Sequence, residues 1–116
     1  MQRIEKWRVE ELTIVLNELS NLLRKGDDYE WANVFSHFYQ ESQNIASGKE
    51  FNLDSLLKLV ANVSNCFSRA SSLSNIVLWQ ENSEERTHAN QELFQTRARL
   101  LKILKDIEDL SVDYIS

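Results

Sequence analysis

The segment QRIEKWRVEELTIVLNELSNLLRKG, residues 2–26, decides the expected fold of this chain. Its apolar residues recur at short intervals of three to five, which places them in one stripe along a helix. The stripe comprises Ile4, Trp7, Leu12, Val15, Leu16, Leu19, Leu22 and Leu23. Arg24 and Lys25 suit the negative end of a helix, and we expect Gly26 to end it as a left-handed residue. The segment therefore predicts a long amphipathic helix that packs against others.

Three further segments show the same period. The second is expected to begin behind Asp27 or Asp28, and its apolar residues are Trp31, Val34, Phe35, Phe38 and Tyr39. The third begins behind Asn52 and carries Leu53, Leu56, Leu57, Leu59, Val60, Val63, Cys66 and Phe67. The last begins behind Asn82 or Ser83 and carries Leu93, Phe94, Leu101, Leu104, Ile107 and Leu110. Its first turns are so polar that we expect them to project before the helix packs.

The composition supports the same fold class. The chain has 116 residues, no proline and two glycines, of which Gly48 is expected to close the second helix. Because turns favour glycine and proline, their scarcity favours long helices with short connections, which pack as antiparallel neighbours. We predict an all-α, single-domain fold over residues 1–116, a compact helical bundle of four to six helices.

One short run does not fit a helical or strand period. Residues 76–79 are all apolar, and we expect this run to be buried on more than one side. It would be a short helix or an extended piece across the end of the bundle, since periodicity does not decide between them. Trp7, Trp31 and Trp79 are expected in the core rather than at an interface.

The charge and cysteine content limit the partners and the location. The net charge of −5 disfavours direct binding to nucleic acid or to an anionic membrane, and is compatible with a basic protein partner. A single cysteine excludes an internal disulfide. Neither a signal peptide nor a membrane-spanning stretch is expected, so the expected location is cytoplasmic.

Few residues are candidates for catalysis. His37 and Glu41 share a helix face, but they supply two metal ligands where a catalytic zinc site needs three. His88 has no obvious partner, and Cys66 lies on an apolar stripe, where a buried structural thiol is expected. Phosphate-binding loops and nucleophile motifs are absent from the sequence. We therefore expect no enzyme, no metal and no cofactor.

Three short motifs resemble a family of small, uncharacterised bacterial all-α domains. They are YEWANVF at residues 29–35, SSLSNIVLWQ at residues 71–80 and ANQELFQTRARLLKIL at residues 89–104. The family pattern has glycines where this chain has residues 68–72, so a close backbone approach there is lost or changed. The family resembles proteins encoded near interbacterial toxins, some of them immunity-protein-like. The resemblance implies a binding role and no catalytic residue.

The acidic residues suggest where a partner would bind. They gather near the start and the end of the last helix, the second group together with an aromatic residue. Carboxylates steer a basic partner and an aromatic side chain anchors it. The expected partner-binding residues are Glu81, Glu84, Glu85, Asp106, Asp109, Asp113 and Tyr114. The leading hypothesis is a bacterial immunity protein that occludes the basic active site of a toxin, such as a contact-dependent growth inhibition nuclease. The alternative is a structural or assembly module that forms a homodimer through the first or last helix.

Overall fold

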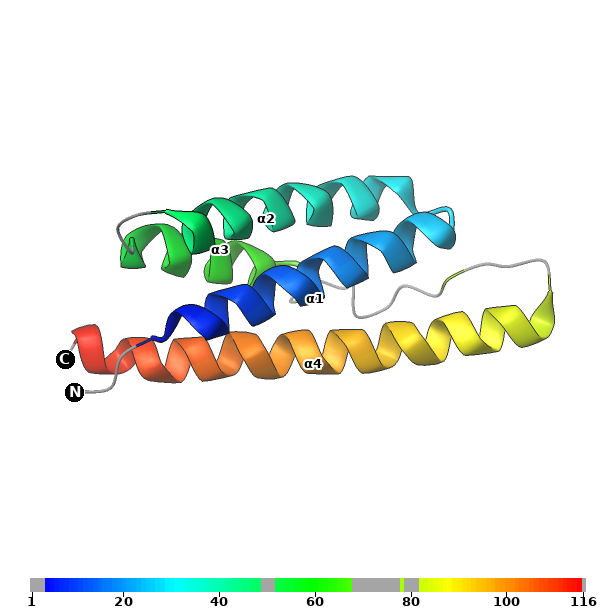
Figure 1. Ribbon diagram of the computed structural model, residues 1–116. Helices are drawn as coiled ribbons and strands as arrows, with labels where there is room; N and C mark the ends of the chain where they lie inside the picture. Colours follow the sequence, from blue (N-terminus) through cyan, green and yellow to red (C-terminus); the bar gives the residue numbers. More distant parts are fainter. Residues whose placement is uncertain (1–3, 49–51, 68–77, 79–81, 116) are drawn as a thin grey trace.

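The computed structural model describes residues 4–48, 52–67, 78 and 82–115, with side chains of the last helix described as far as residue 111. The helices are α1 (Lys6–Lys25), α2 (Tyr29–Ser47), α3 (Leu53–Asn65) and α4 (Ser83–Ile115), as Figure 1 shows. None of the described residues forms a strand. The prediction of an all-α, single-domain helical bundle is confirmed, with four helices in the described part of the chain.

Polar side chains cap the first turns of three helices. Asp28, Asn52 and Asn82 each present a side-chain oxygen to amides of the following turn, at 2.8 to 3.2 Å. These amides have no partner inside their own helix, so each cap satisfies a group that would otherwise need water. Of the alternatives left open by the sequence, Asp28 rather than Asp27, and Asn82 rather than Ser83, is the cap.

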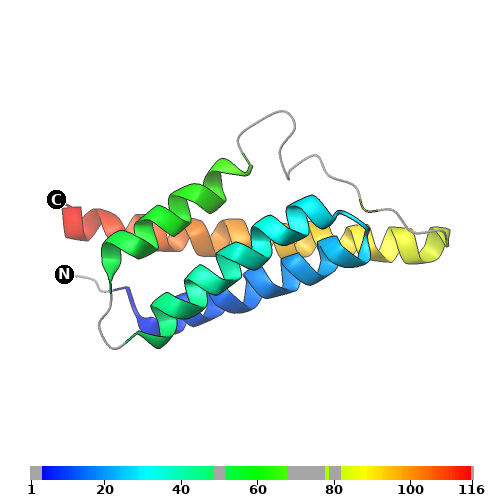
Figure 2. The same cartoon turned by 90° about the horizontal axis from the view of Figure 1, so that it is seen from above.

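The helix α1 is the centre of the bundle. It packs along α2 on one side and along α4 on the other, and α3 lies against both α2 and α4, as seen from above in Figure 2. The largest fully buried side chains come from all four helices and one connection: Leu12, Leu16, Leu19, Leu23, Phe35, Leu56, Leu59, Leu78, Leu93, Leu100 and Ile107. Burying each such side chain stabilises the fold by roughly 1.5–3 kcal/mol, so this shared core holds the helices together.

The turn between α1 and α2 differs from the prediction. Gly26 has a φ of −87° and is not left-handed, whereas Asp27 has a φ of 62°. Asp tolerates the left-handed region better than most side chains, so the turn does not need glycine for its chirality. Gly26 is needed for space, because a Cβ placed there would lie 2.5 Å from Leu78 Cδ2. The expectation of a left-handed stop at Gly26 is therefore wrong.

The helix α4 extends past the rest of the bundle. It has 33 residues and is about 50 Å long at 1.5 Å per residue. Figures 1 and 2 both show its first turns beyond the end of α1. Residues 82–85 are exposed, and Leu93 is the first fully buried residue of the helix. The expectation that α4 projects before it packs is confirmed.

Two residues expected in the stripe of α4 are on its surface. Phe94 is 67% exposed and Leu101 is 44% exposed. Each directly follows a fully buried residue, Leu93 or Leu100, and neighbouring positions on a helix point about 100° apart. In these two pairs the first residue faces the core and the second faces outward, so the sequence assignment of Phe94 and Leu101 is wrong.

The tryptophans also divide between core and surface. Trp31 is half-buried against the core, as expected. Trp7 is 48% exposed, and its expected place in the core is wrong. It lies two residues before Val9, which is buried and therefore points to nearly the opposite side of α1. Trp79 lies outside the described residues.

Candidate functional site

The expected partner-binding residues fall at the two ends of α4. Glu84 and Glu85 are exposed in its first turn, and Asp106 and Asp109 lie in its last third. Glu85 and Asp106 are 21 residues apart, which is about 32 Å along the helix. A standard interface buries roughly 800 Å² of each partner, a patch about 30 Å across. The two groups are therefore about one interface diameter apart, at opposite edges of any single patch that includes both.

The structure does not describe the side chains of three of the expected partner-binding residues. Glu81 lies outside the described residues, and for Asp113 and Tyr114 only the helical backbone is described. Because α4 continues without a break to Ile115, Asp113 and Tyr114 belong to the same end of the helix as Asp109. Their expected roles stay predictions.

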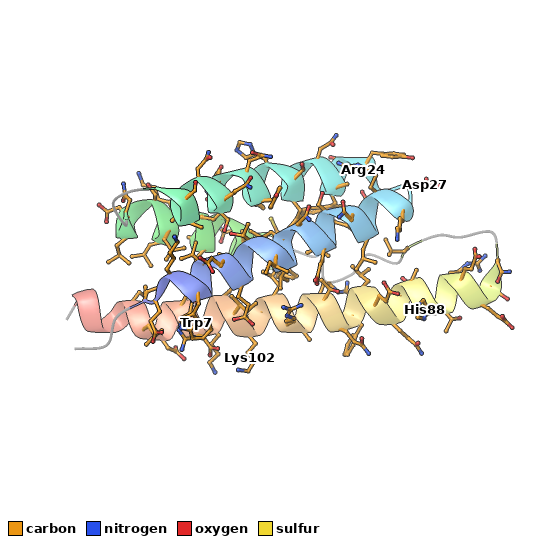
Figure 3. All side chains as sticks on the ribbon, viewed as in Figure 1. Trp7, Arg24, Asp27, His88 and Lys102 are labelled. Carbon is orange, nitrogen blue, oxygen red and sulfur yellow. The ribbon has the colours of Figure 1, made fainter. Side chains whose placement is uncertain are left out.

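An acidic hollow of about 510 Å³ opens between the end of α1 and the first half of α4. It is lined by Leu22, Lys25, Glu84, Glu85, His88, Ala89 and Glu92. Three carboxylates outnumber the single lysine, so the hollow is negative at neutral pH, while a leucine and an alanine supply an apolar surface. Figure 3 shows His88 near the projecting end of α4. A lining of this kind fits a cation with an apolar stem.

Only part of this hollow was expected from the sequence. Glu84 and Glu85 are among the predicted partner-binding residues, whereas Glu92, two turns further along α4, is not. The spacing of Glu85, His88 and Glu92, three and then four residues, places them on one helix face and is a signal that could have found them. The contribution of Leu22 has no such signal, because it depends on how α1 packs against α4.

The two histidines each pair with a carboxylate one turn later. His37 Nε2 lies 2.7 Å from Glu41 Oε1, on the shared face that the sequence predicts. His88 Nε2 lies 2.7 Å from Glu92 Oε1, which corrects the expectation that His88 has no partner. Both pairs are on the surface. Within the described ranges, no group of three or more His, Cys, Asp or Glu side chains is arranged to hold a metal ion.

The acidic group near the end of α4 has a different environment. The Asp106 carboxylate lies 3.8 Å from Arg8 Nη1 of α1 and 3.5 Å from Lys102 Nζ of α4. These two cations neutralise much of its charge, and the Arg8 contact links α4 to α1. Asp109 is exposed, and the structure gives it no ion pair with another described residue. Part of this acidic group therefore serves the fold itself.

The Cys66 side chain is partly buried at the end of α3. Its Sγ donates a weak hydrogen bond to the Asn62 carbonyl at 3.5 Å. Burial raises the pKa of the Cys66 thiol above its ordinary value, so it stays protonated at neutral pH. A protonated thiol is a poor nucleophile.

Leu78 is the one residue of the apolar run 76–79 that the structure describes, and both its side chain and its backbone make contacts with the bundle. The Leu78 side chain is 1% exposed and lies beside Gly26. Asn90 of α4 contacts both backbone polar groups of Leu78: its Oδ1 accepts from the amide at 2.7 Å, and its Nδ2 donates to the carbonyl at 3.0 Å. The expected burial is confirmed for Leu78, and the rest of the run lies outside the described residues.

None of the helices, over the residues described, is long and apolar enough to cross a membrane. Comparison of the chain with protein-family models, with curated proteins and with solved structures finds no match. The resemblance to a family of small bacterial domains therefore rests on the sequence motifs alone.

Proposed function

We propose that this protein is a non-catalytic binding protein that neutralises a cognate bacterial toxin, as an immunity protein does. The observation that carries the proposal is the acidic hollow with its apolar lining between α1 and α4. The toxin is a basic domain, such as a nuclease used in contact-dependent growth inhibition. Neutralisation takes place in the cytoplasm, where such a nuclease meets its substrate.

The hollow suits one lysine or arginine side chain of the toxin. The methylene groups of that side chain pack on Leu22 and Ala89, and its charged head lies among Glu84, Glu85 and Glu92. Nucleases bind phosphate with basic side chains, so a basic residue held in this hollow is withdrawn from the substrate. The mechanism is therefore occlusion, with no covalent step.

The position of the hollow favours binding at this end of the molecule. Glu84 and Glu85 lie on the projecting turns of α4, where a partner meets little steric hindrance. Neither forms an ion pair with another described residue, whereas Asp106 is already shared between Arg8 and Lys102. The net charge of −5 also attracts a basic partner over a distance, which raises the association rate.

The proposal is tested by binding and by protection. Each basic toxin domain encoded in the genes that flank this one is co-expressed with the protein, and both affinity and cell growth are measured. We expect Glu84→Lys with Glu85→Lys to weaken binding on the order of 100-fold and to abolish protection, because two carboxylates become cations facing a cationic partner.

Two further variants make the result specific. Asn44→Lys places a lysine on the exposed surface of α2 and should leave the affinity unchanged. Asp109→Lys reverses the charge of one exposed carboxylate in the last third of α4. If only Asp109→Lys weakens binding, the hollow is not the binding site. If the wild-type protein neither binds the domain nor protects cells, the proposed function itself is wrong.

A further inference from the structure

Two helices leave large apolar side chains on the surface at a regular spacing. On α1, Trp7 is 48% and Ile14 is 53% exposed; on α4, Phe94 is 67% and Leu101 is 44% exposed. Among the described residues these are four of the five exposed large apolar side chains, the fifth being Tyr29. Residues seven apart lie on the same side of a helix, about 10 Å from each other. Each pair therefore forms the apolar part of a surface stripe.

The residues between and beyond these pairs carry opposite charges on the two helices. The α1 stripe consists of Trp7, Glu10, Glu11, Ile14 and Glu18. The α4 stripe consists of Phe94, Arg97, Ala98, Leu101 and Lys105. The intervals within the two stripes are identical: three, four, seven and eleven residues from the first member. One stripe thus carries carboxylates at the positions where the other carries cations or an alanine.

The α4 stripe is also hollowed. Phe67, at the end of α3, joins Phe94, Arg97, Ala98 and Leu101 around a depression of about 190 Å³. No carboxylate is among the described residues that line it. Because the lining is apolar apart from Arg97, an apolar side chain flanked by carboxylates suits this depression in polarity and in charge.

We propose that the α1 stripe of one copy of this protein docks on the α4 stripe of a second copy. The alternative pairings of like stripes are disfavoured by charge, because two α4 stripes bring cations together and two α1 stripes bring carboxylates together. The proposal stands independently of toxin neutralisation, since the acidic hollow lies on neither stripe.

Some charges of the stripes already have contacts within the chain, and two of these contacts are exposed ion pairs. Glu18 lies 3.2 Å from Arg99, and Glu10 lies 4.0 Å from Lys6. Ion pairs between side chains this exposed contribute little to stability, so they can be exchanged for contacts with a second copy. Arg97 also interacts within the chain, and Lys105 extends the cationic side of the stripe beyond it.

The contact joins two different surfaces of the two copies, so it is head to tail and not two-fold symmetric. Each copy in such a pair keeps one unused stripe, and association continues head to tail or closes into a ring. Each stripe has only two exposed large apolar side chains, whereas a stable complex buries roughly 800 Å² on each partner. We therefore expect dissociation constants in the micromolar to millimolar range.

Sedimentation of the purified protein tests the proposal. The average mass of the wild-type chain should rise between about 10 µM and about 1 mM, and rise less in about 0.5 M salt, which screens the charges. Ile14→Lys, which blocks the α1 stripe, and Leu101→Glu, which blocks the α4 stripe, should each remain monomeric alone. An equimolar mixture of the two variants should form a dimer and nothing larger, because one good stripe remains on each chain.

Several results would overturn the proposal. The first is that the wild-type protein stays monomeric at about 1 mM. The second is that either single variant dimerises alone. The third is that the mixture of the two variants stays monomeric while the wild-type chain associates. Asn44→Lys and Asn44→Glu make the same charge changes on α2 and should not alter association. Circular dichroism verifies the fold of each variant, and Trp7→Ser with Phe94→Ser forms a second matched pair if one of the first pair fails to fold.

Discussion

The two ends of α4 are joined to the bundle by different kinds of contact. Near its start, Asn90 holds the amide and carbonyl of Leu78, and the Leu78 side chain fills the space that Gly26 leaves open. Near its end, Ile103 and Ile107 are buried in the core, and the polar contact with α1 is ionic: the Asp106 carboxylate lies 3.8 Å from Arg8 Nη1. Both ends carry carboxylates in the sequence, yet only one end uses a carboxylate to pack the helices.

The difference shows how similar acidic groups acquire different roles. Neutral hydrogen bonds to a buried backbone are not screened by salt, and breaking them leaves polar groups without partners. Ion pairs between partly exposed side chains contribute about 1 kcal/mol or less and weaken in salt. The first joint therefore stabilises α4 without using Glu84 or Glu85, which stay accessible to a partner. At the second joint, Arg8 and Lys102 neutralise much of the charge of Asp106.

The largest effect is expected when the first joint is broken at Asn90. Asn90→Ala removes the partners of the Leu78 amide and carbonyl, each of which costs about 1–3 kcal/mol if it stays unsatisfied. The better helix propensity of alanine offsets roughly 0.5 kcal/mol. We expect the free energy of unfolding, measured in urea, to fall by about 2 kcal/mol.

The neighbouring position supplies the control for Asn90→Ala. Gln91 is exposed, and Gln91→Ala should change the free energy of unfolding by less than about 0.5 kcal/mol. Equal effects of the two substitutions would show that the Asn90 joint does not hold the start of α4, and the contrast between the two ends would fail.

A smaller loss is expected at Gly26, on the other side of the same joint. In Gly26→Ala the new Cβ lies 2.5 Å from Leu78 Cδ2 and 2.9 Å from its Cβ, so Leu78 must shift. Overpacking of this kind costs about 1–2 kcal/mol. Gly48→Ala, at the exposed end of α2, should be near neutral in the same thermal or urea unfolding experiment.

A double-mutant cycle with Leu78→Ala sharpens the Gly26 prediction. If the cost of Gly26→Ala comes from contact with Leu78, it should shrink by at least about 0.5 kcal/mol once that side chain is removed. If the cost of Gly26→Ala stays unchanged, it comes from the backbone of the turn and not from contact with Leu78. We do not expect that result, because alanine readily adopts the φ of −87° found at Gly26.

The helices were predictable because their signals are local. The apolar period, the capping side chains Asp28, Asn52 and Asn82, and Gly48 at the end of α2 all act within a few residues of the position they define. The polar first turns of α4 likewise predicted that it projects. Local physics therefore gave the fold class and the approximate helix boundaries.

The site was only partly predictable because it depends on contacts between distant segments. The need for glycine at position 26 comes from Leu78, and the acidic hollow needs Leu22 of α1 beside Ala89 of α4. Adjacent apolar residues raise a related problem, since the sequence does not say which of Leu93 and Phe94 faces the core. For Asp106 the missing information is its partner: the sequence shows the carboxylate but not its contact with Arg8 of α1.

The smallest effect is expected at the ionic joint, where Asp106→Asn and Asp109→Asn form a matched pair. Asp106→Asn leaves the half-buried Arg8 without its carboxylate and should lower the free energy of unfolding by about 0.5–1 kcal/mol at low salt. Asp109→Asn should have almost no effect, because the Asp109 carboxylate is exposed and forms no ion pair with another described residue. In about 1 M salt the difference between the two variants should largely vanish, while the loss in Asn90→Ala should persist. If Asp106→Asn instead costs as much as Asn90→Ala, and does so in high salt, the end of α4 is held as firmly as its start. Asp106 would then serve only to hold α4 to α1, and its charge would not be available to a partner.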